Sequence, residues 1–148
     1  MAKISFYRMT QNDLTTVSEI ENKSFSTAWT LKDFQEIINY NNILPLVAKV
    51  EENFIAYVLL GFSENIVTIL KFVIVPEFRR RGLGKIILPG VLDFIRQQKN
   101  FTAARLHVRT ENFAAIHLYE ICGFKVIERL KNYYKHDNED AFLMERKI

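Results

Sequence analysis

Residues 73–85 constrain the fold of this chain more than any other stretch. An apolar, β-branched run ends at Pro76, three consecutive arginines and two glycines spaced G-x-G follow, and an apolar-periodic segment then predicts a helix. In such a strand–turn–helix, the N–H groups of the turn and the helix dipole favour an anion such as phosphate. A lone G-x-G is weak evidence, because many of these turns need glycine for backbone reasons alone. From this stretch alone, two interpretations stay open: an anion-binding site and a purely structural turn.

The length of 148 residues suits one domain, which we expect to span residues 1–148. Hydrophobic residues make up 49% of the chain and charged residues 25%, as in soluble globular proteins. The net charge of +3 suits an anionic ligand, but it is too small to require nucleic acid, and we expect no direct nucleic acid binding. The single cysteine, Cys122, rules out an internal disulfide and fits a reducing cytosol. Because the chain shows neither a signal peptide nor a long apolar run, we expect a cytoplasmic protein that binds no membrane.

Hydrophobic periodicity predicts a mixed α/β domain. Residues 10–13 and 30–33 are capping boxes, and apolar residues at helical spacing follow each of them. The run 72–75 is continuously apolar, so we expect it to be buried on both faces in the centre of the sheet. Asn112 and Gly123 fit the two ends of a further helix. The expected strands are 4–7, 43–50, 54–62, 65–75, 104–109, 124–134 and 141–148, and the expected helices are 14–20, 31–38, 83–95 and 113–122.

Two spaced motifs resemble the GNAT acetyltransferase superfamily. Residues 79–84 match its R-x-x-G-x-G turn, and residues 112–124 look like its second motif, N-x-A-A-I-x-L-Y-x-x-x-G-F. Within the superfamily, L-H-V-R at 106–109, N-Y-Y at 132–134 and E-D-A at 139–141 resemble the N-terminal protein acetyltransferases, and in particular the ribosomal-protein alanine N-acetyltransferases. The resemblance is strong from about residue 73 to the end and looser over the first half.

The resemblance implies the GNAT fold, an α/β (mixed α+β) arrangement in which about four helices flank a mostly antiparallel, twisted sheet of about seven strands. It also implies acetyl-CoA as the cofactor and no metal. Gly82 and Gly84 would be required because a Cβ would crowd the pyrophosphate. The strand at Val73 and Val75 would leave its neighbour at a bulge, pair with the pantetheine arm, and polarise the thioester carbonyl with a backbone N–H. Asn112 would hydrogen-bond the cofactor arm, although a plain helix cap is the alternative. The turn residues expected to wrap the pyrophosphate are Arg79, Arg80, Arg81, Gly82, Leu83, Gly84 and Lys85.

The same resemblance assigns catalytic roles to Tyr119 and His107. Tyr119 would act as general acid on the departing thiolate, and its alternative is a core tyrosine. At the position of His107, bacterial ribosomal-protein acetyltransferases typically have a glutamate, thought to be the base, whereas several eukaryotic-type enzymes have histidine. His107 alternates with apolar neighbours in its strand, so it could face a cleft and accept a proton, directly or through water. A structural histidine is the alternative. We interpret Cys122 as a packing residue rather than a nucleophile.

An α-amine is a plausible acceptor on physical grounds. Only the neutral amine attacks a thioester, and deprotonation at pH 7 costs roughly 1 kcal/mol for an α-amine but roughly 4.6 kcal/mol for a lysine. By resemblance, Tyr133 and Tyr134 would grip the substrate backbone, and Phe25 and Trp29 could close the other side of the groove, with the first side chain in an apolar pocket. Because adjacent residues of a strand alternate faces, one of the two tyrosines could instead belong to the core.

The sequence thus favours transfer of acetyl from acetyl-CoA to the N-terminal α-amine of a protein, with a ribosomal protein as one possible substrate. One alternative within the superfamily is acetylation of a small amine, such as a polyamine, an antibiotic or an amino acid. The other is a CoA-binding module without catalysis. The N-Y-Y and E-D-A sequences favour the first hypothesis, because small-molecule members generally lack them.

Overall fold

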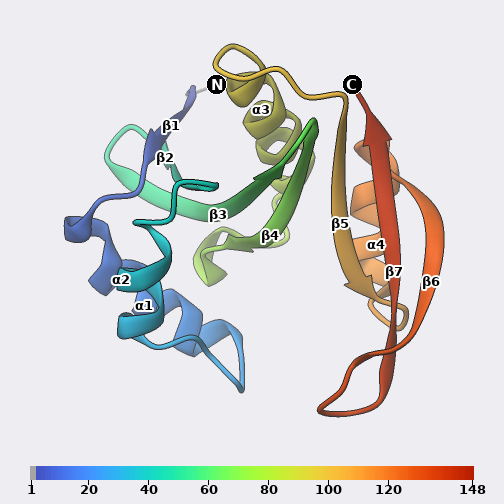
Figure 1. Ribbon diagram of the computed structural model, residues 1–148. Coiled ribbons are helices and arrows are strands. Elements are labelled where there is room, and N and C mark those ends of the chain that lie inside the picture. The colour runs from blue at the N-terminus through green and yellow to red at the C-terminus, as the bar shows by residue number, and fades with distance from the viewer. Residues whose placement is uncertain (1–2) are drawn as a thin grey trace. The chain divides into compact units, whose positions relative to one another are not determined.

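The computed structural model describes residues 3–148, so residues 1–2 of the expected domain lie outside the described residues. The described part contains seven strands and four α-helices in the predicted order, which confirms a mixed α/β fold (Figure 1). None of these helices between residues 3 and 148 combines the length and the hydropathy needed to cross a membrane. The strands are β1 (Ile4–Arg8), β2 (Ile43–Val50), β3 (Asn53–Ser63), β4 (Ile66–Ile74), β5 (Ala103–Arg109), β6 (Lys125–Tyr134) and β7 (Glu139–Lys147). The helices are α1 (Leu14–Ser24), α2 (Leu31–Ile37), α3 (Gly84–Arg96) and α4 (Phe113–Ile121), with short 3₁₀ helices η1 (Gln11–Asp13) and η2 (Pro76–Phe78).

The strands are ordered β1-β2-β3-β4-β5-β7-β6 in the sheet. The pairs β1–β2, β2–β3, β5–β7 and β6–β7 are antiparallel, and β4 runs parallel to β5. The chain divides into two compact units: unit 1 comprises Met1–Gly61 and Lys71–Leu83, and unit 2 comprises Phe62–Leu70 and Gly84–Ile148. The expectation of a single domain over residues 1–148 stays a prediction.

In unit 1, both helices start where the capping boxes predict. The side chain of Thr30 accepts the N–H of Asp33, and Asp33 in return accepts the N–H of Thr30. At η1, directly before α1, Asp13 accepts the N–H of Thr10 in the same way, whereas the N–H of Asp13 donates to the backbone carbonyl of Thr10. These contacts satisfy N–H groups that a helix start otherwise leaves without a partner.

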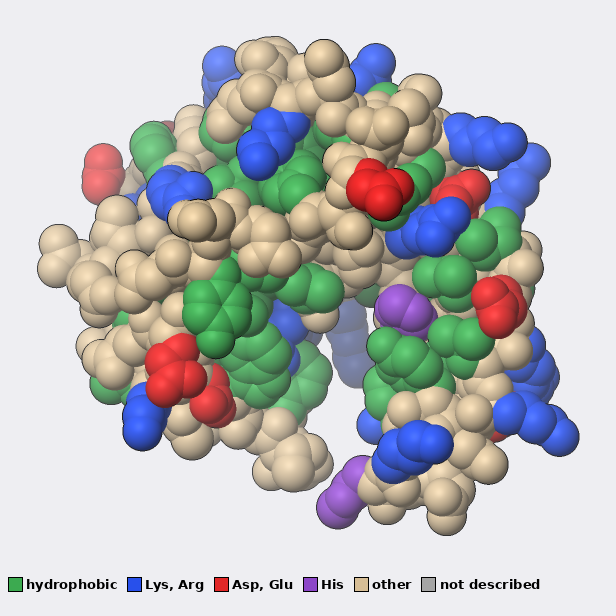
Figure 2. Space-filling model, viewed as in Figure 1, with side chains coloured by type: hydrophobic (Ala, Val, Ile, Leu, Met, Phe, Trp, Pro, Cys, Tyr) green, Lys and Arg blue, Asp and Glu red, His purple; other side chains and the backbone are tan. Residues whose placement is uncertain are grey.

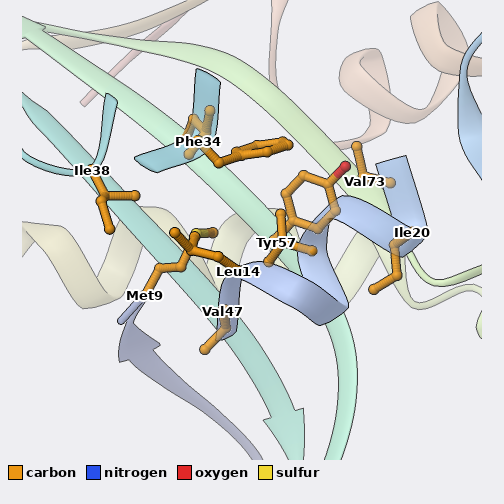
Figure 3. Packing of buried hydrophobic residues seen from close by; sticks show 10 residues of the cluster. Met9, Leu14, Ile20, Phe34, Ile38, Val47, Tyr57 and Val73 are labelled. Atoms are coloured by element: carbon orange, nitrogen blue, oxygen red, sulfur yellow. The ribbon is translucent and has the colours of Figure 1, made fainter. Parts of the chain in front are cut away.

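The core of unit 1 joins α1 and α2 to β2, β3 and the last part of β4 (Figure 3). Phe34 of α2 meets the ring of Tyr57 edge-on, with centroids 6.1 Å apart. Burial of each large apolar side chain contributes about 1.5–3 kcal/mol, so this cluster holds both helices on one face of the strands. Its buried members are Met9, Leu14, Val17, Ile20, Phe34, Ile38, Val47, Tyr57, Leu59 and Val73.

The prediction that residues 72–75 are buried on both faces is wrong. Only Val73 is buried, and Phe72, Ile74 and Val75 are half-buried. Within the run, Val73 belongs to the core of unit 1 and the half-buried Val75 packs against it, because the pleat of a strand points alternate side chains to the same face.

In unit 2, β5 has one buried face and one half-exposed face. Leu106 and Val108 are buried, whereas Arg105, His107 and Arg109 alternate with them. The parallel pairing of β4 and β5 runs from Ile66–Ala103 to Ile69–Leu106, and β7 pairs with all of β5. β5 is thus fixed on both sides, so its polar face is presented by a rigid strand.

The ends of α4 are those predicted from the sequence. Asn112 is the N-cap, and its side chain accepts the N–H of Ala115. Gly123 follows the helix with φ of +93°, a left-handed conformation that glycine adopts without strain. Phe124 then turns back into the buried interior at the start of β6.

Candidate active site

The basic turn of unit 1 exposes a row of backbone N–H groups. Arg80 and Gly82 are both left-handed, with φ of 62° and 72°. Within residues 3–148, the N–H groups of Arg80, Arg81, Gly82 and Leu83 donate to no backbone carbonyl. Free N–H groups in a turn of this kind, directly before a helix, form a ready site for an anion. The turn therefore fits a phosphate that is held through its backbone.

The two glycines of the turn have different local constraints. A Cβ at Gly82 would meet no protein atom within 4 Å, so the positive φ is what requires glycine there. A Cβ at Gly84, in unit 2, would lie 2.9 Å from Cδ2 of Leu118 on α4. Packing against α4 thus restricts Gly84, a constraint that the sequence did not reveal, and crowding of a phosphate stays a prediction for both glycines.

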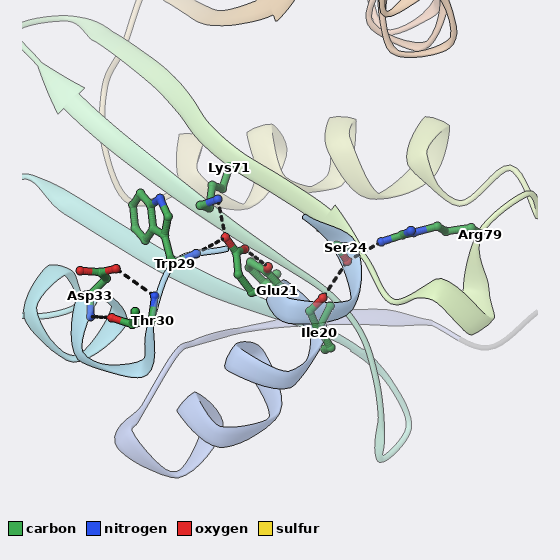
Figure 4. A network of polar contacts seen from close by, with 9 residues as sticks. Ile20, Glu21, Ser24, Trp29, Thr30, Asp33, Lys71 and Arg79 are labelled. Atoms are coloured by element: carbon green, nitrogen blue, oxygen red, sulfur yellow. Dashed lines mark hydrogen bonds and ion pairs between the residues drawn. The ribbon is translucent and has the colours of Figure 1, made fainter. Parts of the chain in front are cut away.

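The arginine side chains of the turn are partly committed to the protein itself. Arg79 donates through a terminal nitrogen to Ser24 Oγ at 2.7 Å (Figure 4). It also donates through Nε to the carbonyl of Ile74 at 2.8 Å. The guanidinium of Arg81 lies 5.3 Å from the centroid of the Phe78 ring. Arg79 therefore ties the turn to the end of α1, whereas Arg80 and Lys85 are exposed.

At the end of β4, Val73 and Val75 differ in their surroundings. The side chain of Val73 is buried in the core of unit 1. The N–H of Val75 donates to the carbonyl of Ile55 at 2.9 Å, so this N–H is engaged within unit 1. A role of either residue toward a cofactor stays a prediction.

His107 lies on the half-exposed face of β5 against an aromatic ring. Its imidazole stacks on the ring of Tyr133, with centroids 4.6 Å apart and planes inclined by 9°. Figure 2 shows hydrophobic side chains interspersed with charged ones over the visible face of the protein. Burial lowers the pKa of His107 below its ordinary value, because the charged imidazolium loses contact with water. The neutral, proton-accepting form therefore dominates at pH 7.

A pocket of about 400 Å³ opens beside His107 within unit 2. Arg105, which is also in its wall, forms an ion pair with Glu145, with 2.7 Å between Nε and the nearer carboxylate oxygen. The pocket gives His107 access to solvent and to a bound group. Its lining residues are Ser63, Glu64, Ile66, Thr68, Arg105, His107 and Leu143.

The β6–β7 hairpin that carries Tyr133 and Tyr134 is fastened to β5 by Arg109. The guanidinium lies 2.8 Å from Asp137 and 3.2 Å from Glu139, and 4.0 Å from the centroid of the Tyr134 ring. The two tyrosines meet edge-on at 5.1 Å. Both rings therefore make contacts on this side of unit 2. Neither lies in a buried core, since Tyr133 is exposed and Tyr134 is half-buried.

Tyr119 is a half-buried residue of α4 whose ring meets Phe124 edge-on at 6.2 Å. Burial, with smaller effects from Tyr134 and Cys122, raises the pKa of Tyr119 to about 12. Its hydroxyl therefore keeps its proton through the neutral range and can donate a hydrogen bond. Asn112, at the start of the same helix, uses Oδ1 for the cap, and its exposed side chain leaves the amide nitrogen for a ligand.

Phe25 and Trp29 both contact the same cation. The ammonium of Lys71 lies 4.6 Å from the centroid of the Phe25 ring and 4.7 Å from that of Trp29. Trp29 also packs on the core of unit 1 through Phe34, at 5.4 Å. Phe25 and Trp29, which were expected to close one side of the substrate groove, thus lie around the ammonium group of Lys71.

Sequence reasoning missed Glu21, which organises these aromatic residues. Its side chain is 0% exposed, and it accepts hydrogen bonds from the Tyr57 hydroxyl, the Trp29 N–H and Lys71 (Figure 4). A signal was present in the sequence: Glu21 comes four residues after Val17, on the buried stripe of α1. A charged residue on an apolar helix face requires partners, because an unpaired buried charge is very costly.

Unit 2 brings His107, Tyr133 and Tyr134 into one connected set of rings, whereas the ring of Tyr119 contacts Phe124. Unit 1 separately brings Phe25 and Trp29 together around Lys71. The roles of these residues toward a cofactor or an acceptor stay predictions.

Comparison with known proteins places this chain among acyl-transferring enzymes. A model of the Acetyltransferase (GNAT) family matches residues 14–124. The ribosomal protein bS18-alanine N-acetyltransferase of Salmonella typhimurium is 30% identical over 140 residues, which cover 92% of each chain. The crystal structure of the ribosomal-protein-S18-alanine N-acetyltransferase from Escherichia coli matches with a TM-score of 0.85 and 25% identity, over 99% of this chain and 94% of that one. The spermidine N-acetyltransferase of Vibrio cholerae, crystallised with CoA and spermine, matches with a TM-score of 0.84 over 97% of this chain and 95% of that one, but at 21% identity it shows a shared fold alone.

Proposed function

Because this chain belongs to the GNAT acetyltransferase family, we propose that it transfers the acetyl group of acetyl-CoA to the N-terminal α-amine of a protein. The family uses acetyl-CoA as its co-substrate, and the chain is an N-acetyltransferase. The proposal of a protein N-terminus as the acceptor rests on one observation above all: His107 is held neutral beside an accessible pocket.

A weak base of this kind suits an α-amine better than a lysine side chain. Deprotonation at pH 7 costs roughly 1 kcal/mol for an α-amine of pKa about 7.7–8.0, and roughly 4.6 kcal/mol for a lysine of pKa about 10.4. A histidine whose pKa lies below its usual value can accept the amine proton in the first case. In the second case it would face a proton transfer that is unfavourable by several further kcal/mol.

The reaction we propose is direct attack in a ternary complex. The neutral amine attacks the thioester carbonyl, a C–N bond forms and the C–S bond breaks. His107 takes the amine proton, directly or through water. A backbone N–H near Val73 would stabilise the developing oxyanion.

Tyr119 would act on the departing thiolate. With a pKa of about 12, against about 8.5 for an ordinary thiol, full transfer of its proton would be uphill by roughly 5 kcal/mol. We therefore assign Tyr119 the role of a hydrogen-bond donor that stabilises the thiolate until a proton arrives. This role replaces the full general acid that the family resemblance implied.

The co-substrate would be held by the basic turn. The free N–H groups of Arg80, Arg81, Gly82 and Leu83 fit its pyrophosphate, and the start of α3 at Gly84 and Lys85 favours the same negative charge. The amide nitrogen of Asn112 would bind the pantetheine arm.

A second acceptor class is a small amine. The fold shared with a spermidine N-acetyltransferase keeps this alternative open. The names of the relatives favour a protein acceptor, and a ribosomal protein is therefore the substrate to test first. For such a substrate a cytoplasmic location is the natural one.

The deciding experiment is thiol release from acetyl-CoA in the presence of four acceptors. These are a peptide with a free N-terminal alanine, the same peptide with a blocked N-terminus and an internal lysine, spermidine, and buffer alone. We expect release with the free N-terminus and little with the blocked peptide. Release with spermidine or the lysine peptide, but not with the free N-terminus, would contradict the proposal. Binding of acetyl-CoA without turnover of any acceptor would indicate a non-catalytic CoA-binding module.

A further inference from the structure

Three side chains of unit 1 meet around the side chain of Lys71. Its ammonium donates to Glu21 Oε2 at 2.9 Å and lies 4.7 Å from the centroid of the Trp29 ring (Figure 4). It also lies 4.6 Å from the centroid of the Phe25 ring. The Lys71 side chain is 14% exposed and that of Glu21 is 0% exposed. The lysine is therefore almost enclosed, and the half-exposed ring of Phe25 forms the outer wall.

The carboxylate of Glu21, at the base of this site, is also held by two hydrogen bonds that do not involve Lys71. Glu21 Oε1 accepts from the Tyr57 hydroxyl, and Oε2 accepts the Trp29 N–H at 2.9 Å. Burial, together with the hydrogen bond to Glu21, raises the pKa of Tyr57 far above its ordinary value, as expected beside an anion. Both of these donors are neutral, and within residues 3–148 the ion pair of Glu21 is with the ammonium of Lys71.

A buried carboxylate and two ring faces make up a recognition site for an alkylammonium ion. Aromatic faces attract such cations, and the attraction grows when water is excluded. A buried carboxylate that has lost its cation pays a large desolvation cost, so it binds another cation when one fits. The chemistry of the site is thus general for primary ammonium groups, and a lysine of the chain itself takes the place of the ligand.

We propose that Glu21, Phe25 and Trp29 form an alkylammonium-binding cage that Lys71 fills from within the chain, and that Lys71 thereby excludes polycationic acceptors. The cage stands on the contacts of unit 1 alone. The exclusion of polycations rests on the proposed function, because it assumes that Phe25 and Trp29 border the acceptor site. An acceptor with one α-amine brings a single amine to the reaction and needs no second cation site, whereas a polyamine brings further ammonium groups that the filled cage cannot take.

The cage is tested first without any reaction. Lys71→Ala leaves the carboxylate and both rings but removes the cation. Methylammonium chloride should then raise the thermal unfolding midpoint of Lys71→Ala saturably, by roughly 3 °C at ten times its dissociation constant. Sodium chloride at equal ionic strength should not have this effect, nor should methylammonium act on the wild-type chain or on Lys71→Arg.

Two further variants isolate the cause. In Glu21→Gln/Lys71→Ala the methylammonium effect should vanish, because the anion at the base of the cage is gone. Lys49→Ala removes another lysine that lies over a ring, at 5.6 Å from Tyr7, but has no buried carboxylate, so it should gain no response. The proposal of a cage is wrong if Lys71→Ala responds no more than wild type or no more than the double variant.

A measurement on the wild-type chain keeps the cage testable if Lys71→Ala does not fold. The ring currents of Phe25 and Trp29 should move the ε-methylene proton resonances of Lys71 upfield of those of the exposed lysines. In Phe25→Leu this displacement should shrink. Resonances of Lys71 at the values of an exposed lysine would overturn the proposal.

The effect on acceptor choice is tested separately. Relative to wild type, Lys71→Ala should raise the ratio of kcat/KM for spermidine to kcat/KM for the alanine peptide at least about 10-fold, the size of effect expected for one desolvated cation site. Lys71→Arg should leave this ratio unchanged. If methylammonium binds but the ratio stays constant, the cage is correct and the exclusion is wrong. If no peptide is acetylated by any variant, it is the proposed function that fails, and the binding result still decides the cage.

Discussion

The imidazole of His107 lies face to face with the phenol ring of Tyr133, 4.6 Å away and inclined by only 9°. His107 is in β5 and Tyr133 in β6, with β7 between them in the sheet. The pairing therefore depends on the hairpin that carries Tyr133 reaching over β7. Since the ring covers one face of the imidazole, it contributes to the burial that lowers the pKa of His107.

The first prediction concerns the pH dependence of kcat/KM for a peptide with a free N-terminus. The acceptor amine gives a rise of slope one below its pKa of about 8. Below the pKa of His107, which lies under the ordinary value of about 6.5, protonation of the imidazole also removes the base. The slope of log kcat/KM against pH should therefore increase from one to two there. His107→Ala should lower kcat/KM about 100-fold and leave only the slope of one that the amine gives below its pKa.

The control for this prediction is His117→Ala, which changes an exposed histidine of α4. A second variant, Tyr133→Leu, should move the His107 limb to higher pH, because the imidazolium regains water when the ring is lost. If His107→Ala retains a near wild-type rate between about pH 6 and 9, His107 is structural.

The second prediction concerns Tyr119. Tyr119→Phe should lower kcat about 10- to 100-fold and change KM for the peptide little, because the hydroxyl acts on the thiolate that appears only in the transition state. No limb from Tyr119 should appear in the wild-type profile below pH 10, since its pKa is raised to about 12. Steady-state thiol release checks both statements, and Tyr40→Phe, at an exposed tyrosine, is the control. An unchanged kcat in Tyr119→Phe would leave the tyrosine with a packing role only.

The third prediction concerns Arg109. Arg109→Gln removes the ion pairs to Asp137 and Glu139 that fasten the hairpin, so KM for the peptide should rise at least about 5-fold while KM for acetyl-CoA changes little. Arg96→Gln, which breaks an exposed ion pair on α3, is the matched control. A proportional rise of both KM values would indicate a general loss of structure instead.

The ion pairs of Arg109 should hold the hairpin equally well from pH 6 to 9. The hydrogen bond from Arg109 lowers the pKa of Asp137 below its ordinary value. A group with a lowered pKa stabilises the folded state above its unfolded pKa, and this stabilisation is lost as the pH falls through the folded value. The hairpin should therefore loosen only in acid, below about pH 4.

The fourth prediction concerns the stability of unit 1. Glu21→Gln leaves the ammonium of Lys71 nearly enclosed without a counter-charge, so the free energy of unfolding should fall by about 3 kcal/mol. Urea unfolding measures this change. Asp93→Asn, at an exposed ion pair of α3, should have no measurable effect. Equal effects of the two substitutions would mean that the buried pair contributes nothing particular.

The fifth prediction separates packing from phosphate contact at Gly84. In the wild-type background, Gly84→Ala brings a Cβ to 2.9 Å from Leu118, and the free energy of unfolding should fall by about 1 kcal/mol. In a Leu118→Ala background this cost should disappear, because the clash is gone. Any weakening of acetyl-CoA binding that remains in the double variant then reports crowding of the phosphate alone.

Much of the fold follows from local sequence signals. The capping boxes begun by Thr10 and Thr30, the cap at Asn112 and the glycine at Gly123 act over a few residues, so they can be recognised without a tertiary structure. The two spaced motifs were equally informative, and the family match over residues 14–124 confirms the family that they indicated. The burial of residues 72–75 was predicted wrongly, because an apolar run does not specify which elements cover each face of a strand.

The sequence by itself determined the order of the strands and α-helices and the family. Only the tertiary structure decided how individual residues are used: that Tyr133 stacks on His107, that Arg79 bonds to Ser24 and Ile74, and that the charge of Glu21 is met by Lys71. The physical reason is that the pKa of a side chain and its free hydrogen-bonding groups depend on burial and on partners distant in the sequence. Glu21 and Lys71 are 50 residues apart, and no local pattern couples them.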